Sequence, residues 1–194
     1  MCGICGFVTR GDDFEAGTII NMTEVLTHRG PDRAGVYLNR VGGEHPDKSF
    51  ERGDVALGHR RLSIIDLSET ASQPMCNEDG SVWLVFNGEI YNFAELRAQL
   101  IDRGHLFRSK GDSEVIIHGY EEWGEQLFEK LNGMFAIALW DSKRKRLVLV
   151  RDRLGIKPLF FYLKGDRIIF ASEVTSIRVH PIFGESIDRE SLYD

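Results

Sequence analysis

The sequence predicts an α+β fold in which antiparallel sheets are layered with helices, and two observations support this prediction. Two pairs of β-rich segments are joined by short polar turns, namely Phe135–Trp140 with Leu147–Val150 and Leu159–Leu163 with Arg167–Ala171. Such hairpins favour antiparallel sheets. The sequence also has no Gly-x-Gly-x-x-Gly motif and no Gly-Lys-Ser/Thr phosphate loop, so a doubly wound nucleotide-binding fold has no support.

One further strand and one basic turn follow from local composition. Ser81–Phe86 is rich in β-branched and aromatic residues, and Asn87-Gly88 directly after it is a strong turn signal. The four cations Lys143–Arg146 fall between two predicted strands, a position typical of a solvated hairpin tip. The net charge of −6 also argues against a broad nucleic-acid surface.

Three segments are expected to be helical. Apolar residues recur at mixed helical spacing in Thr18–Leu26, and they share one face in Phe93–Ile101 and in Ser113–Trp123. Asp112 stands directly before the third segment, where its side chain would cap the helix. The pattern of helices and hairpins points to an α+β or αββα arrangement.

Length and composition predict one soluble domain spanning residues 1–194. Hydrophobic residues make up 42% of the chain and charged residues 28%, as in ordinary globular proteins. No apolar run reaches the roughly 18 residues of a membrane span, and no secretory signal is visible. We therefore expect a cytoplasmic protein with no membrane partner, whose three cysteines are thiols.

The chain begins Met-Cys-Gly-Ile-Cys, which allows two interpretations of Cys2. A Cys-x-x-Cys pair can serve in a zinc or redox site, but structural zinc needs four ligands and no second pair of cysteines or closely spaced histidines is present. A redox pair normally lies at a strand-to-helix junction rather than at the start of a chain. We therefore expect no metal site in this domain.

The second interpretation depends on position two itself. Removal of Met1 would leave Cys2 with a free α-amine beside its own thiol. The ordinary pKa is about 7.7–8.0 for such an amine and about 8.5 for a thiol. An amine of this kind can act as a general base near neutral pH, and it is a known partner for an N-terminal nucleophile.

Five further motifs carry polar residues at turns and segment ends. They are His28-Arg29-Gly30-Pro31-Asp32, the segment 58–66 with Arg60-Arg61, Asn87-Gly88-Glu89-Ile90-Tyr91-Asn92, the segment 111–116 and the segment 151–159. Each motif alone is compatible with a turn, a helix cap or a surface ion pair. As a set, they resemble the N-terminal glutaminase domain of glutamine-dependent asparagine synthetases, which are class II amidotransferases.

The resemblance runs from Cys2 to Glu173 and implies a four-layer αββα sandwich of two mainly antiparallel sheets, the N-terminal nucleophile hydrolase fold. It implies that Cys2 is the nucleophile, that its α-amine moves the proton, and that Asn87 and Gly88 donate to the oxyanion. A thioester on Cys2 would then be hydrolysed, giving glutamate and ammonia. No histidine is required for this chemistry, so His28 and His59 are expected to be structural.

The resemblance also implies how glutamine is held. Arg61 would bind the α-carboxylate through a bidentate fork, while Arg60 faces away. Glu89 and Asp112 would lie near the α-ammonium, and Leu62 to Ile65 would add backbone contacts. The implied substrate-binding set is Arg61, Leu62, Ser63, Ile64, Ile65, Asn87, Gly88, Glu89 and Asp112.

In this family the chain continues into a C-terminal synthetase domain that uses ATP and Mg²⁺, whereas the glutaminase domain itself needs no cofactor. We therefore expect residues 1–194 to be one domain of a longer chain, and a homodimer is one assembly open to it. Two alternatives are an amidotransferase domain that serves another acceptor, and a non-catalytic glutamine-binding domain that retains Met1.

Overall fold

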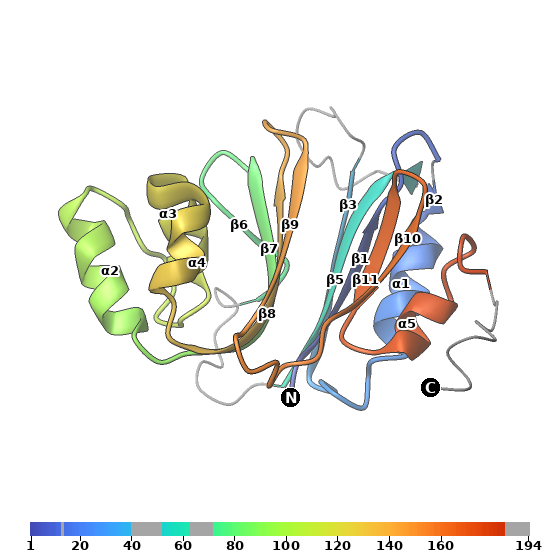
Figure 1. Ribbon diagram of the computed structural model, residues 1–194, viewed down its shortest axis with the longest axis horizontal. Helices are drawn as coiled ribbons and strands as arrows, with labels where there is room; N and C mark the ends of the chain where they lie inside the picture. Colours follow the sequence, from blue (N-terminus) through green and yellow to red (C-terminus); the bar gives the residue numbers. More distant parts are fainter. Residues whose placement is uncertain (13, 40–51, 63–71, 185–194) are drawn as a thin grey trace.

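The computed structural model describes residues 1–12, 14–39, 52–62 and 72–184. Figure 1 shows four layers: α2, α3 and α4 cover one sheet, a second sheet packs against the first, and α1 and α5 cover the outer face of the second. The N-terminus lies between the two sheets at one end of the sandwich. The predicted αββα arrangement is therefore confirmed.

The helices are α1 (Ala16–Glu24), α2 (Phe93–Asp102), α3 (Glu114–Trp123), α4 (Leu127–Lys130) and α5 (Val174–Arg178), with a 3₁₀ turn η2 at Gly124–Gln126. The strands are β1 (Gly3–Val8), β2 (Phe14–Glu15), β3 (Arg33–Asn39), β4 (Arg52–Gly53), β5 (Val55–Arg61), β6 (Met75–Cys76), β7 (Val82–Ile90), β8 (Gly133–Asp141), β9 (Arg146–Arg151), β10 (Phe160–Lys164) and β11 (Arg167–Ala171).

Both large sheets are antiparallel throughout their described pairs. One has the order β10-β11-β1-β5-β3, and the other has the order β6-β7-β8-β9. The short strands β2 and β4 form a separate pair. The hairpins predicted around residues 141–146 and 164–166 are β8–β9 and β10–β11, so both predictions are confirmed.

Strand β1 is buried on both faces, which places it at the centre of the core. Ile4 and Val8 point into the layer between the sheets, whereas Cys5 and Phe7 point into the layer under α1 and α5. This alternation is the two-residue period of a strand. Burial on both faces explains why β1 reads as a continuous apolar run interrupted only by glycine.

The turn predicted at Asn87-Gly88 is wrong, because β7 continues through both residues to Ile90. Gly88 lies opposite Phe135 in the ladder with β8. A Cβ atom on Gly88 would lie 2.2 Å from the carbonyl oxygen of Met134. The glycine therefore permits close approach of two strands, and it does not make a turn.

The three predicted helices are present, with starts or ends shifted by one or two residues. The predicted capping role of Asp112 is wrong. The N-cap residue of α3 is Ser113, and no side chain caps this helix. Asp112 instead accepts a hydrogen bond from the backbone N–H of Ile90, at 2.9 Å, and so ties the start of α3 to the end of β7.

Two surface features complete the description. The basic turn is neutralised locally, since Lys143 pairs with Asp79 and Arg144 with Asp141.

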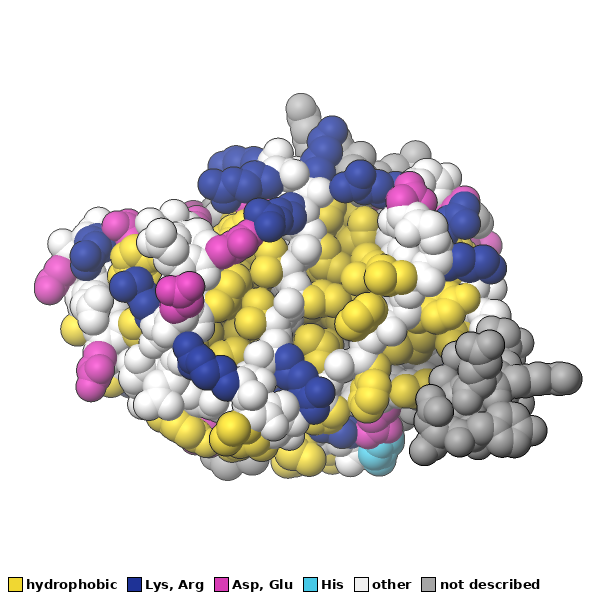
Figure 2. All heavy atoms as spheres, viewed as in Figure 1, with side chains coloured by type: hydrophobic (Ala, Val, Ile, Leu, Met, Phe, Trp, Pro, Cys, Tyr) yellow, Lys and Arg dark blue, Asp and Glu magenta, His cyan; other side chains and the backbone are white. Residues whose placement is uncertain are grey.

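Figure 2 shows hydrophobic side chains gathered on the face that β9 and β10 border. Large exposed apolar side chains between residues 154 and 163 include Leu154, Ile156, Phe160, Phe161 and Leu163. In the described residues, no helix has the length and hydropathy of a membrane span.

We expect Gly88→Ala to destabilise the fold by about 1–3 kcal/mol, because the new methyl group meets immobile backbone atoms of β8. Urea unfolding followed by circular dichroism measures this loss. The matched control is Gly17→Ala in α1, where a Cβ atom meets nothing within 4 Å. That change should stabilise by about 0.5–1 kcal/mol, as expected for alanine in a helix. Equal stability of Gly88→Ala and the parent would contradict the strand-packing role.

Candidate active site

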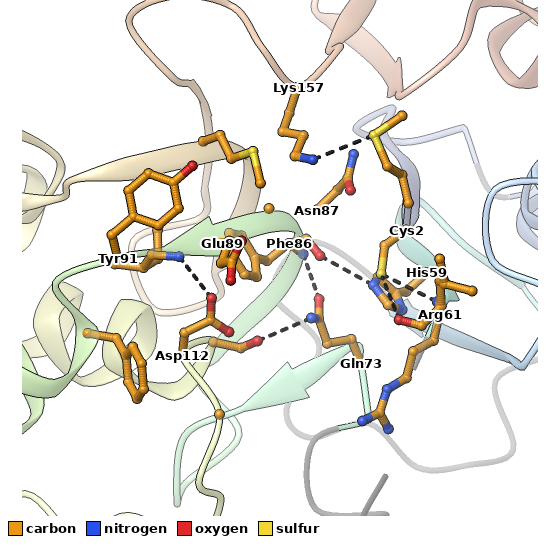
Figure 3. Close-up of a pocket in the computed structure, with 18 of the residues that line it drawn as sticks. Cys2, His59, Arg61, Gln73, Phe86, Asn87, Glu89, Tyr91, Asp112 and Lys157 are labelled. Atoms are coloured by element: carbon orange, nitrogen blue, oxygen red, sulfur yellow. Dashed lines mark hydrogen bonds between the residues drawn. The ribbon is translucent and has the colours of Figure 1, made fainter. Parts of the chain in front are cut away.

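A cavity of about 420 Å³ opens at the end of the sandwich where β1 begins. Figure 3 shows the side chains of Cys2, Asn87 and Lys157 directed into it, with Asp112 on its opposite side. The cavity also takes in Arg61. It therefore gathers residues from segments that are far apart in the sequence.

Sheet pairing brings Cys2 to the cavity. Gly3 is paired with Arg60, so Cys2 lies level with the end of β5. The backbone N–H of Leu62 lies 3.5 Å from the Cys2 sulfur and donates to it, while the carbonyl oxygen of Leu62 lies 3.9 Å from the same sulfur. The carbonyl oxygen of Cys2 accepts a hydrogen bond from Arg29 Nε at 3.0 Å. The nucleophile is thus held from both sides.

The turn at residues 28–32 supports this arrangement. Arg29 also pairs with Glu173, with 2.9 Å between Nη1 and Oε1. Gly30 lies so close to β5 that a Cβ atom would be 2.6 Å from the Arg60 carbonyl. The N–H of Asp32 donates to the carbonyl oxygen of Arg61. The Arg-Gly-Pro-Asp motif therefore links the start of β1 to the end of β5.

The second cysteine of the Cys-x-x-Cys pair lies elsewhere. Cys5 is fully buried in the layer under α1, and its sulfur lies 3.5 Å from the Thr23 hydroxyl. Burial raises the pKa of the Cys5 thiol to about 11, so the thiol is inert at neutral pH. Cys2 and Cys5 are both free thiols on different surfaces of the core, and the zinc or redox interpretation of the pair is therefore wrong.

The two adjacent arginines point to different places. Arg61 is 9% exposed and lines the cavity. Arg60 instead donates from Nε to the carbonyl oxygen of Thr23, at 3.1 Å, on the side of α1. Successive residues of a strand face opposite ways, which explains the difference. The prediction that Arg61, and not Arg60, faces the substrate cavity is consistent with these positions.

Asn87 supplies a buried amide that lacks a partner. Its side chain is 2% exposed, and Nδ2 has no hydrogen-bond partner among the described residues. Val85, two residues earlier on β7, faces the layer between the sheets, as Ile4 does on β1. Asn87 and Cys2 continue these two rows, so they meet at the same end of that layer. A buried donor left without a partner indicates that a ligand atom completes it.

The backbone N–H of Gly88 points in the same direction as two N–H groups whose partners are known. Phe86 donates to Gln73 Oε1 at 2.6 Å, and Ile90 donates to Asp112. Both bonds lie on the edge of β7 that faces away from β8. N–H groups two residues apart along a strand share one edge. Gly88 lies midway between them, so its N–H faces the cavity.

Two carboxylates form the acidic side of the cavity. Glu89 and Asp112 both line it. Burial raises the pKa of Asp112, and the nearby charge of Glu89 raises it further, against the hydrogen bond from Ile90. A cationic group bound between them would relieve both effects. The cavity therefore combines an arginine with two acids, which suits an amino acid with both α-groups charged.

The family comparison agrees with this geometry. The family described as a glutamine amidotransferase domain matches residues 1–194. The chain belongs to the glutamine amidotransferase family. The domain is 41% identical to asparagine synthetase [glutamine-hydrolyzing] 3 of Bacillus subtilis, over 99% of this chain and 30% of that protein. It is 38% identical to a putative asparagine synthetase of Methanocaldococcus jannaschii, over 89% of this chain and 32% of that protein.

The amidotransferase domain thus spans about a third of the length of these relatives. Its fold is also that of a solved glutamine phosphoribosylpyrophosphate amidotransferase from B. subtilis. That structure matches with a TM-score of 0.74 and 24% identity, covering 92% of this chain and 43% of the other. The expected N-terminal nucleophile hydrolase fold is therefore confirmed.

The structure adds two cavity residues that the sequence analysis missed. Lys157 is only 7% exposed, and its Nζ lies 3.5 Å from the sulfur of Met1. Gln73 holds the N–H of Phe86 and approaches the Ser113 hydroxyl. Lys157 could have been suspected from its place in the motif at 151–159, whereas nothing in the sequence marks Gln73. The predicted substrate residues Ser63, Ile64 and Ile65 lie outside the described residues.

Neither histidine near the nucleophile is placed as a proton shuttle. His28 is exposed and pairs with Glu173. His59 is 2% exposed, and its Nε2 lies 3.3 Å from the carbonyl oxygen of Phe86. Burial, with a smaller contribution from the charge of Arg61, lowers the pKa of His59 to about 4. The amidotransferase domain therefore carries a neutral His59 at neutral pH, in a structural position.

This buried histidine should make the fold sensitive to acid. The unfolded pKa of histidine is about 6.5, so the unfolded chain binds a proton at a higher pH than the folded one does. The contribution of neutral His59 to the free energy of unfolding is therefore fully present above pH 6.5. It is lost as the pH falls towards 4, and the total loss is about 3 kcal/mol. In the His59→Gln variant, the midpoint of urea unfolding should depend less on pH between pH 7 and 4.5 than it does in the parent. An unchanged profile would contradict the assignment.

Proposed function

We propose that this domain hydrolyses glutamine to glutamate and ammonia with Cys2 as the nucleophile. We further propose that the ammonia serves a synthetase part of a longer chain, which converts aspartate to asparagine. The observation that carries the proposal is the convergence of the Cys2 thiol with the unpartnered amide of Asn87 and the arginine Arg61 in one cavity.

The reaction needs a base for the thiol, and the α-amine of Cys2 supplies it once Met1 is removed. Cys2 Sγ attacks the side-chain carbonyl carbon of glutamine while the amine takes the thiol proton. The tetrahedral intermediate collapses as the amine returns that proton to the departing ammonia. Water then attacks the thioester, and its breakdown releases glutamate and restores the thiol. One water is consumed and one ammonia is formed for each glutamine.

Both tetrahedral intermediates carry an oxyanion. Asn87 Nδ2 and the N–H of Gly88 would donate to it, which is supported by the unpartnered Nδ2 and by the position of both residues in the cavity on the same strand. Loss of one such donor typically costs about 2.7–4 kcal/mol of transition-state stabilisation. The buried ammonium of Lys157 adds positive charge to the same side of the cavity and would favour the same anion.

The charged residues of the cavity suit the two α-groups of the substrate, which are bonded to the same carbon. Arg61 would hold the α-carboxylate, since a guanidinium can donate two parallel hydrogen bonds to it. Glu89 and Asp112 would hold the α-ammonium, which offsets the cost of placing two carboxylates together. This binding leaves the side-chain amide to reach Cys2.

Met1 stands over the nucleophile. It is 58% exposed, lines the cavity and contacts Lys157 through its sulfur. Its peptide bond to Cys2 occupies the nitrogen that the mechanism uses as a base. Removal of Met1 therefore both opens the cavity and creates the catalytic amine.

We expect Cys2→Ala to abolish glutamate release from glutamine, because the nucleophile is lost. The matched control is Cys76→Ala, which removes a half-buried thiol of β6 and should retain activity. Protein that keeps Met1 should be at least about 100-fold slower than the processed form, since it lacks the general base. Intact mass identifies the two forms. Glutamate release by Cys2→Ala at the parental rate would overturn the proposal.

The two arginines offer a test of substrate binding. Arg61→Met should raise the KM for glutamine by about 10-fold to 100-fold, which corresponds to losing one charged hydrogen-bonded contact of about 1.5–3 kcal/mol. Arg60→Met removes the same charge one residue away, where the side chain bonds to Thr23, and should leave KM nearly unchanged. Steady-state kinetics of glutamate release measure the KM of both variants. Equal effects on KM would show that Arg61 has no special contact with the substrate.

Aspartate is proposed as the ammonia acceptor because several relatives are named asparagine synthetases and are about three to four times as long as this domain. A different acceptor is the second candidate. It is favoured by the similarity to a relative named amidase chry2 of Gibberella zeae, which is 34% identical over 91% of this chain and 26% of that protein. In both cases the exposed apolar side chains between Leu154 and Leu163 offer a surface for a further domain.

A further inference from the structure

A second group of chemically active side chains lies in the outer helix layer, away from the cavity. His105, His118 and Glu121 each offer a ligand atom, and these three atoms lie within 4.8 Å of one another. None of the three residues lines the glutamine cavity. The mechanism proposed above gives them no role.

The fold assembles the cluster from two elements. His118 and Glu121 are three residues apart on α3, so they share one face of that helix. His105 comes from the segment that follows α2. Glu121 Oε2 lies 3.0 Å from His118 Nδ1 and 3.9 Å from His105 Nδ1. One carboxylate oxygen therefore faces the Nδ1 atoms of two imidazoles.

Further carboxylates lie beside the other ring nitrogens. His105 Nε2 is hydrogen-bonded to Glu122 Oε2 at 3.4 Å, whereas His118 Nε2 lies 3.5 Å from Glu114 Oε1 and makes no hydrogen bond among the described residues. The remaining oxygen of Glu121 accepts a hydrogen bond from Asn77 Nδ2 at 2.8 Å. Carboxylates on the outer nitrogens of histidines are the usual support of metal-binding imidazoles.

The supporting carboxylate of Glu114 is itself fixed. It accepts hydrogen bonds from the backbone N–H groups of Arg108 and Ser109 and from the Ser109 hydroxyl. Glu114 is 6% exposed and His118 is 2% exposed, so this side of the cluster is rigid and shielded from water. The Nδ1 atoms of His118 and His105 lie 3.0 Å and 3.9 Å from the shared oxygen of Glu121.

We propose that His105, His118 and Glu121 bind a divalent metal ion of the zinc class. Two imidazoles and one carboxylate, with water as a fourth ligand, are a known tetrahedral zinc set. Bonds of about 2.0–2.2 Å place tetrahedral ligands roughly 3.3–3.6 Å apart, and the two distances to Glu121 Oε2 lie on either side of this range. The two nitrogen ligands favour zinc, copper or nickel over calcium and magnesium.

Such an ion would join the segment after α2 to α3. Helix α3 begins two residues after Asp112, a residue of the glutamine cavity. The ion would therefore stiffen the helix layer that holds the acidic side of the cavity, without touching the substrate. A structural role of this kind predicts a rise in thermal stability on metal binding.

The test is zinc titration of the Cys2→Ala protein by isothermal calorimetry. This background is needed because the Cys2 thiol can itself bind zinc. We expect one zinc ion per chain, and we expect His105→Ala and Glu121→Gln to weaken binding at least about tenfold. The matched control is His28→Gln, which removes an exposed histidine outside the cluster and should leave binding unchanged. Circular dichroism confirms that each variant is folded.

Two further measurements do not depend on enzyme activity. Cobalt should give the visible absorption of a tetrahedral site without a thiolate charge-transfer band, and zinc should raise the melting temperature of the Cys2→Ala protein but not that of its His105→Ala variant. Failure of the folded Cys2→Ala protein to bind zinc stoichiometrically would overturn the proposal. Undiminished zinc affinity in both His105→Ala and Glu121→Gln would do the same, and the cluster would then be a network of hydrogen bonds alone.

Discussion

The pairing of β1 with β5 is the interaction on which the active site depends. Its register places Gly3 opposite Arg60, and so brings the start of the chain level with Arg61 and Leu62. Arg29 then holds the Cys2 carbonyl, while Gly30 allows the turn to approach β5. A shift of one residue would turn every side chain of β1 to the opposite face and remove Cys2 from the cavity.

The second sheet completes the site because the two sheets pack face to face. The row of β7 residues that packs against the first sheet ends in Asn87, while the outer edge of the same strand presents the N–H of Gly88. The cavity thus combines hydrogen-bond donors and cations with two carboxylates. The charge distribution matches a zwitterionic amino acid and an anionic transition state, which no single segment of the chain could provide.

Much of the fold could be predicted from local patterns. The hairpins at 141–146 and 164–166 and the three main helices follow from turn residues and periodicity, which act over a few residues. The errors occur where distant contacts override a local signal. Asn87-Gly88 does not turn because β8 pairs with it, and Asp112 does not cap α3 because its carboxylate bonds to Ile90 of β7. Gln73 and the His105 cluster could not be predicted, because the partners of these residues are remote in sequence.

The sequence alone determined the class of fold, the importance of Cys2 at position two and the motif residues of the site, since these depend on local composition and on resemblance to a family. Only the tertiary structure decided that β7 continues through Asn87-Gly88, why Gly88 must lack a side chain, and that burial makes the Cys5 thiol inert. These outcomes depend on the face of a strand and on the distance between backbones. Both are set by strand pairing and packing between segments that are distant in the sequence, and they are not encoded in any one segment.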